Sequence, residues 1–222
     1  PGVPSSELPP EESHAGAEDL WRRYSRRDQL RRGAEEAEAQ MKAEMDQQFA
    51  DHLFDENCER FHENYAPTRN PTIGGDLERA LRGMMIGLGY PHDPSDPASR
   101  RVWSLGSAGY VWRLAEGGGT GFAKDRIREA VEDDFDPEPP RAASLTIAAS
   151  EVIARGIPIG LESPGGLAYG EAFLDRGFHH AMESINEPKV EVEAEHLQGA
   201  FWFGVALHDV EPWVDELRAD AD

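Results

Sequence analysis

Cysteine and lysine are both scarce in this chain of 222 residues. Cys58 is the only cysteine, which excludes a disulfide within one chain and a zinc site built on cysteines. The only lysines are Lys42, Lys124 and Lys189, so 19 of the 22 basic residues are arginines. The single cysteine gives no information on redox compartment.

Long hydrophobic runs are missing as well. No stretch approaches membrane-spanning length, and residues 1–10 lack the basic start and apolar run of a signal peptide. We therefore expect a soluble protein that contacts no membrane and stays in the cytoplasm unless a particle carries it. Hydrophobic residues make up 39% of the chain, which is low for a globular protein but too high for disorder throughout. The length fits one domain with appendages or two small domains.

Acidic residues dominate the charge. The 43 aspartates and glutamates face 22 basic residues, which gives a net charge of -21. Such self-repulsion is tolerable in concentrated salt, because at about 1 M ionic strength the Debye length is only about 3 Å. The composition favours a halophilic host. The alternative is an acidic protein from a high-GC mesophile that binds basic partners.

The N-terminal third predicts an arm followed by long helices. Residues 1–16 are rich in proline and glycine and predict an extended arm, whereas residues 17–65 contain no proline and only Gly33. One helix over 17–65 would be roughly 70 Å long, so we expect a break near Asp55. That break would bring two differently oriented apolar faces to one core: Ala34, Ala37, Met41, Met45, Gln48, Phe49 and His52 on one, and Phe54, Cys58, Phe61 and Tyr65 on the other.

Six arginines lie at the start of this helical segment and are the candidate contact residues: Arg22, Arg23, Arg26, Arg27, Arg31 and Arg32. Packaged DNA is one possible ligand, but six phosphate contacts would lose about five decades of affinity per tenfold rise in salt. An acidic neighbouring subunit is the second possibility. The third is a solvated helix with pairs such as Glu18 with Arg22, each contributing about 0.2 to 0.5 kcal/mol.

Residues 66–210 predict an α+β core domain. Apolar residues at helical spacing predict helices over 77–88, 108–116, 125–133, 142–155 and 174–185. Val102–Leu105 predicts a strand, and alternation at 190–194 and 201–207 predicts a C-terminal hairpin in a small antiparallel sheet. Trp213, Val214 and Leu217 predict a last short helix within the acidic tail of residues 211–222.

Three features could carry chemistry. The loop Gly117–Gly121 with Lys124 nearby matches most of a tubulin-type phosphate loop, although no buried parallel strands precede it. Cys58 with His62, and His179 with Glu183, have the spacing of two metal ligands on one helix turn. Structural roles are favoured for all three, and no nucleophile elbow occurs. We therefore expect no catalytic, cofactor-binding or metal-binding residue.

The order of motifs resembles one known family. The corresponding residues are Ala66-Pro67, Gly75 to Arg79, Tyr110 through Glu116 to Gly119-Thr120, and Ala172 to Phe178. In this order and spacing, over roughly residues 40–186, the chain resembles the tail-completion or neck proteins of long-tailed double-stranded DNA phages. It departs from them at Ile73-Gly74-Gly75, in lacking proline before Phe173, and in an insertion over 122–168.

The resemblance implies a structural virion protein and no enzyme. Proteins of that family form rings between head and tail, and their partners would be portal or adaptor and tail-tube or tail-terminator proteins. With the acidic composition, we expect a homo-oligomeric ring at the head-tail junction of a haloarchaeal tailed virus, present in the host cytoplasm during assembly. The alternatives are a halophilic nucleotide-binding or hydrolytic enzyme that uses the Gly117–Gly121 loop, and a DNA-binding module.

Overall fold

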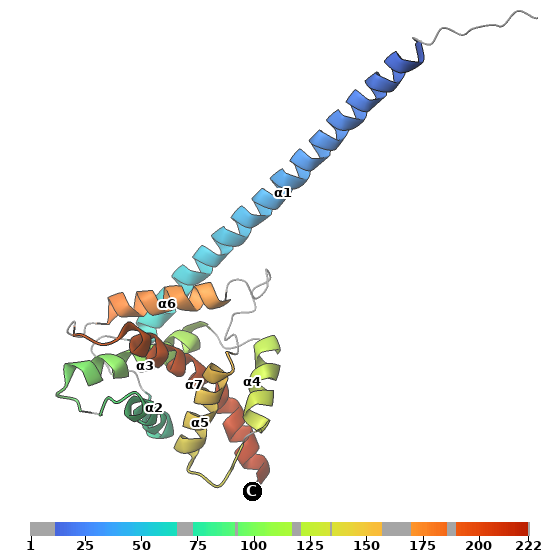
Figure 1. Ribbon diagram of the computed structural model, residues 1–222. Helices are drawn as coiled ribbons and strands as arrows, with labels where there is room; N and C mark the ends of the chain where they lie inside the picture. The colour runs from blue at the N-terminus through green and yellow to red at the C-terminus, as the bar shows by residue number, and fades with distance from the viewer. Residues whose placement is uncertain are drawn as a thin grey trace, which may run out of the picture. The chain divides into compact units, whose positions relative to one another are not determined.

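The computed structural model describes residues 12–65, 73–91, 93–116, 121–133, 135–156, 170–185 and 190–221, without the side chains of 12–24, 27, 28, 121–124, 133, 170 and 171. These residues form seven helices and no strand (Figure 1). The helices are α1 (Glu12–Asn64), α2 (Gly75–Gly87), α3 (Pro97–Glu116), α4 (Gly121–Asp133), α5 (Arg141–Ala154), α6 (Gly170–Ser184) and α7 (Ala194–Ala221). The chain divides into two compact units, residues 1–49 and residues 50–222.

The predicted α+β class is wrong, because none of the three segments predicted as strands is one. Residues 190–193 are irregular and Ala194 begins α7, while the other two segments are largely buried parts of helices. Val102–Leu105 belongs to α3, and Phe201 to Leu207 belongs to α7. Phe201, Phe203, Val205 and Leu207 alternate in the sequence, but Gly204 and Ala206 between them are also buried. A short apolar run that is buried on all sides has no distinctive period, so a helix and a strand look alike in it.

The closest contact in the second unit is between α3 and α7. A Cβ atom on Gly109 would lie 1.9 Å from the carbonyl oxygen of Phe201, and one on Gly204 would lie 1.9 Å from that of Gly106. Only glycine leaves room for two helix backbones at this distance. Around this pair, α7 also packs against α2, α4 and α5, and α6 packs against α3.

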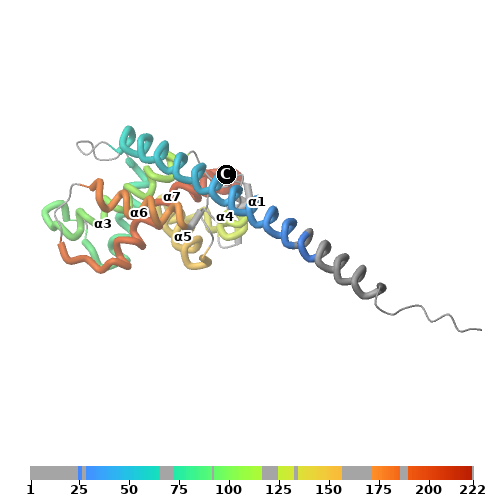
Figure 2. Tube along the Cα trace, turned by 90° about the horizontal axis from the view of Figure 1, so that it is seen from above, coloured from blue at the N-terminus to red at the C-terminus, as the bar shows by residue number. Residues whose placement is uncertain are grey.

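The end of α1 belongs to the core of the second unit. Phe61 is fully buried, and the ring of Phe54 lies 5.6 Å from that of Trp112 in α3 and 5.9 Å from that of Phe173 in α6. Figure 2 shows this last part of α1 alongside α6. The face that contains Phe54, Cys58, Phe61 and Tyr65 therefore packs as the sequence predicts.

The predicted break near Asp55 is wrong, because α1 is continuous from Glu12 to Asn64. The two apolar faces of α1 do not share one core, so no break is needed to bring them together. From Ala50 onward α1 contributes buried residues to the core. Before Ala50 its described side chains are exposed or partly exposed. Five residues of the predicted arm, 12–16, lie within α1, and residues 1–11 fall outside the description.

Four other predicted helices are confirmed. The apolar residues at helical spacing in α2, α5 and α6 face the core, and α4 covers the predicted charged helix at 125–133. The short helix predicted around Trp213 is the end of α7, which continues through Pro212 to Ala221. Residues 211–221, predicted as an acidic tail, are therefore helical.

Candidate functional site

The described part of the first unit carries an exposed apolar stripe. Leu30, Met41, Met45 and Phe49 have exposed fractions of 69%, 59%, 64% and 46%. Ala34 and Ala37, also exposed, fill the interval between Leu30 and Met41 at spacings of four and three residues. We call the set Leu30, Ala34, Ala37, Met41, Met45 and Phe49 the α1 stripe. Steps of three and four residues place these side chains along one side of the helix.

The α1 stripe lies on a helix whose charges are divided along its length. The candidate contact residues Arg26, Arg31 and Arg32 are exposed, and Arg31 lies 3.8 Å from Glu35 in an ion pair between exposed side chains. The side chains of Arg22, Arg23 and Arg27 are outside the described set. An exposed pair of this kind contributes little to stability, about 0.3 to 0.5 kcal/mol.

Sequence reasoning missed a buried charge cluster between α3 and α7. Arg113 Nε donates to Asp209 Oδ1 at 2.7 Å, and Arg113 Nη1 donates to Glu116 Oε2 at 2.6 Å. All three side chains are almost fully buried. A signal was present in the sequence, because Arg113 interrupts the apolar run Tyr110 to Ala115 and its charge must be paired if the run is buried.

The pKa values of this cluster follow from burial and pairing. Burial alone disfavours the charge of Arg113, but Asp209 and Glu116 more than offset it and raise the pKa of Arg113 above its ordinary value. Burial also raises the pKa of Glu116, although Arg113 opposes this effect. Because the three side chains lack solvent access, the cluster serves to join α3 to α7 and is not placed to react with a ligand.

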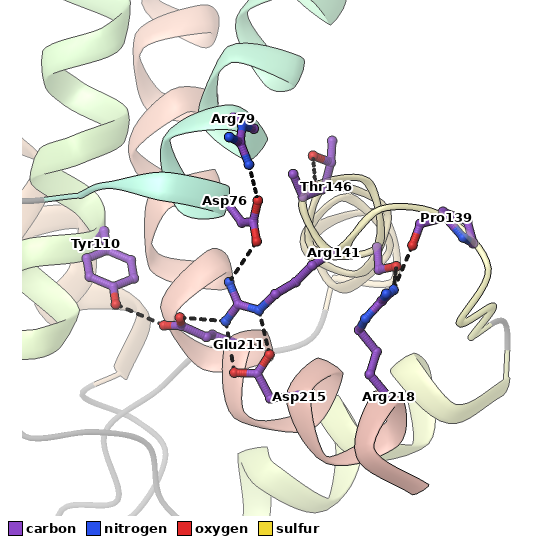
Figure 3. A network of polar contacts seen from close by, with 11 residues as sticks. Asp76, Arg79, Tyr110, Pro139, Arg141, Thr146, Glu211, Asp215 and Arg218 are labelled. Atoms are coloured by element: carbon purple, nitrogen blue, oxygen red, sulfur yellow. Dashed lines mark hydrogen bonds and ion pairs between the residues drawn. The ribbon is translucent and has the colours of Figure 1, made fainter. Parts of the chain in front are cut away.

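A second polar network joins four helices at the surface, as Figure 3 shows. Arg141, at the start of α5, donates to Asp215 Oδ1 at 2.6 Å and to Glu211 Oε1 at 3.0 Å, both in α7. Its Nη1 lies 3.9 Å from Asp76 Oδ2 in α2. Tyr110 of α3 donates to the other oxygen of Glu211 at 3.0 Å. Each acidic group here has a partner, so the network is structural.

The two metal-ligand pairs predicted as possible do not form a site. His62 approaches His180 of α6, with 3.1 Å between their Nε2 atoms, while His179 is exposed. Burial and a nearby acidic residue, Asp55, raise the pKa of Cys58 to about 11, which disfavours the thiolate that a metal requires. Among the described side chains, no group of three or more histidine, cysteine or acidic residues could hold a metal ion.

Residues 117–120 of the predicted glycine loop lie outside the described residues, and Gly121 begins α4. A pocket is lined mainly by residues of α4 and α5, such as Val131, Ile147 and Glu151. Its cavity volume is about 30 Å³, which holds one or two water molecules but no nucleotide.

Comparison of the chain with protein-family models, with curated proteins and with solved structures found no match. Over the helices that the structure describes, none is both long and apolar enough to cross a membrane. The candidate functional site is therefore taken from the structure alone. It is the α1 stripe, whose large apolar side chains are exposed in the described part of the chain.

Proposed function

We propose that this chain is a structural protein that works by assembly with copies of itself and with neighbouring proteins of a viral particle. The α1 stripe is the observation that carries the proposal. It extends from Leu30 to Phe49, a distance of about 29 Å at 1.5 Å per residue. Narrow apolar rows of this kind are the surfaces through which helices bind other helices.

The energetic argument is that the α1 stripe is costly to leave in water. Burying one side chain of the size of leucine, methionine or phenylalanine contributes about 1.5 to 3 kcal/mol. Four such side chains are exposed on one side of α1. Isolated exposed apolar residues need no explanation, but a continuous row marks an interaction surface.

The setting we propose is the head-tail junction of a tailed virus whose host lives in concentrated salt. The order of the motifs that resemble neck proteins supports the junction, although the strand predicted from the sequence at Val102–Leu105 is part of a helix. The net charge of -21 and the scarcity of lysine support the saline host. In such salt the apolar α1 stripe keeps its driving force, whereas exposed charges more than about 3 Å apart are largely screened.

Mass photometry of the full chain in high salt, followed by electron microscopy, tests the assembly. We expect particles at multiples of 24.6 kDa, alone or after addition of the portal and tail proteins encoded beside its gene. Flanking genes for capsid, portal or tail-tube proteins support the viral setting. A chain that stays monomeric with all of those proteins present, or a gene surrounded by metabolic enzymes, contradicts it.

A further inference from the structure

The charge pattern of α1 identifies what covers the α1 stripe. We propose that the occupant is α1 of a second copy of this chain, packed antiparallel and centred near Gly33 and Ala34. The inference rests on the proposed function, since it names one partner in the assembly. It commits to a two-fold pair, and any larger ring would then need a further contact made by residues 50–222.

Two oppositely charged segments follow one another along α1. Residues 22–32 hold six arginines and one aspartate, and we call them the basic segment. Residues 35–46 hold five acidic residues and one lysine, and we call them the acidic segment. The described side chains of both segments are exposed or half-buried. Arg26, Arg31, Glu38 and Glu44 border the α1 stripe and can meet a partner there, whereas Arg32 and Glu36 lie on the opposite side of the helix.

Only one of the simple pairings satisfies both segments at once. A parallel pair in register would place arginines beside arginines and glutamates beside glutamates, which is destabilising. In a parallel pair shifted by about the length of one segment, the basic segment of one copy would lie against the acidic segment of the other. The two remaining segments, one on each copy, would have no oppositely charged partner. An antiparallel pair brings each basic segment against the acidic segment of the partner, and long arginine stems can also cover the apolar row.

The centre of this pairing falls on small residues. The midpoint between the basic and acidic segments is at Gly33 and Ala34, where the two-fold axis would pass. Gly33 lies three residues after Leu30 and four before Ala37, so it borders the α1 stripe. A Cβ on Gly33 would meet no atom of the described residues within 4 Å, so their packing does not require a glycine there. Glycine in a helix interior costs about 1 kcal/mol against alanine, and close approach of a second helix offsets that cost.

Spin-label distances in the full chain distinguish the orientations. Each variant carries Cys58→Ser and one labelled cysteine, either Ala34→Cys near the axis or Gln48→Cys far from it. In the antiparallel pair the two labels at position 34 lie about 10 Å apart, the spacing of packed helices. Position 48 lies 14 residues from position 34, in opposite directions on the two copies. The labels there are separated by the rise of 28 residues, about 42 Å. In a parallel pair in register both distances are about 10 Å.

A matched pair of substitutions tests the surface. Ala37→Glu places a charge in the α1 stripe, whereas Ala39→Glu makes the same change on the opposite side of the same helix. Both positions are exposed, so neither substitution should disturb folding. We expect Ala37→Glu to weaken the dimer at least about tenfold in sedimentation equilibrium, which corresponds to about 1.4 kcal/mol. Ala39→Glu should leave the dissociation constant within about twofold, well below that tenfold step.

The outcomes separate this inference from the proposed function. Short distances at both labelled positions, or equal effects of Ala37→Glu and Ala39→Glu, overturn the antiparallel pair. If the full chain alone is monomeric but forms a complex with the portal or tail proteins, the inference fails and the proposed function stands. If it forms neither a dimer nor a complex, both fail.

Discussion

At the scale of single residues, Arg113 is the side chain whose removal should be most costly, because it is paired with two buried carboxylates. Arg113→Met leaves Glu116 and Asp209 without a counter-charge. We expect the free energy of unfolding to fall by about 3 to 5 kcal/mol, as for other broken buried ion pairs. Denaturant titration followed by circular dichroism in high salt measures it.

The control for Arg113 is Arg128→Ala, which removes an exposed pair with Glu132 and a contact with the Trp213 ring and should change the free energy of unfolding much less. A second comparison neutralises the whole cluster, with Glu116→Gln and Asp209→Asn added to Arg113→Met. This triple variant should recover part of the loss, because it leaves no unpaired charge. Equal losses for Arg113→Met and Arg128→Ala would show that the buried cluster is not important for stability.

His180 gives the chain a pH dependence of known sign. Burial, and then the neighbouring His62, lower the pKa of His180 below its ordinary value of 6.5. The unfolded state therefore binds the proton more tightly than the folded state. Stability should be constant above about pH 6.5, as far as His180 contributes, and should fall as the pH decreases from there to the lowered pKa.

His180→Phe should flatten this pH dependence while it preserves packing, because the ring lies among Phe54, Phe61 and Trp112. The measurement is the melting temperature at a series of pH values in high salt. His179→Phe makes the same change on an exposed side of the same helix and is the matched control. If both variants keep the wild-type slope, His180 does not account for it.

At the scale of elements, the contact between α3 and α7 depends on glycine. Gly109→Ala places a Cβ 1.9 Å from the backbone oxygen of Phe201, so the helices must separate. We expect a loss on the order of 3 kcal/mol, the upper end of ordinary overpacking. Gly199→Ala, in α7, would place a Cβ with no atom of the described residues within 4 Å and should be neutral or stabilising by up to about 1 kcal/mol. Thermal unfolding of the two variants checks this difference, and equal stabilities would refute the close contact.

The same helix pair explains what the sequence could not predict about the fold. Helices α2 and α6 were predicted correctly because one side of each is polar, which makes the period of 3.6 residues visible. In α7 the run Phe201 to Val210 is buried nearly throughout, so alternation along it carried no information on secondary structure. The α+β prediction failed at the elements that form the centre of the molecule.

The candidate site was found in the sequence but misinterpreted. Ala34, Ala37, Met41, Met45 and Phe49 were recognised as one face, and this face was assigned to the core through a break near Asp55. Periodicity shows that a face is apolar but not what covers it. Only the described exposure of Met41 and Met45 distinguishes an interaction surface from a core face.

At the scale of the whole molecule, the two units differ in what completes them. Residues 50–222 contain every core residue that the description identifies, and their buried charged groups, such as Arg113 and Asp209, pair within that unit. The described side chains of residues 25–49 include no buried residue. The second unit therefore has the features of an independently folding domain, whereas the described part of the first leaves its apolar row exposed.

Removal of residues 1–49 tests this division. The remaining residues 50–222 should unfold with a free energy within about 0.5 kcal/mol of the full chain, since deletion of exposed side chains seldom changes stability by more. Self-association should disappear, because the α1 stripe is removed. Denaturant unfolding and sedimentation, both in high salt with the full chain as reference, measure the two effects. If the shortened chain is clearly destabilised, residues 1–49 help to complete the core. If it still dimerises, the main contact between copies lies in residues 50–222.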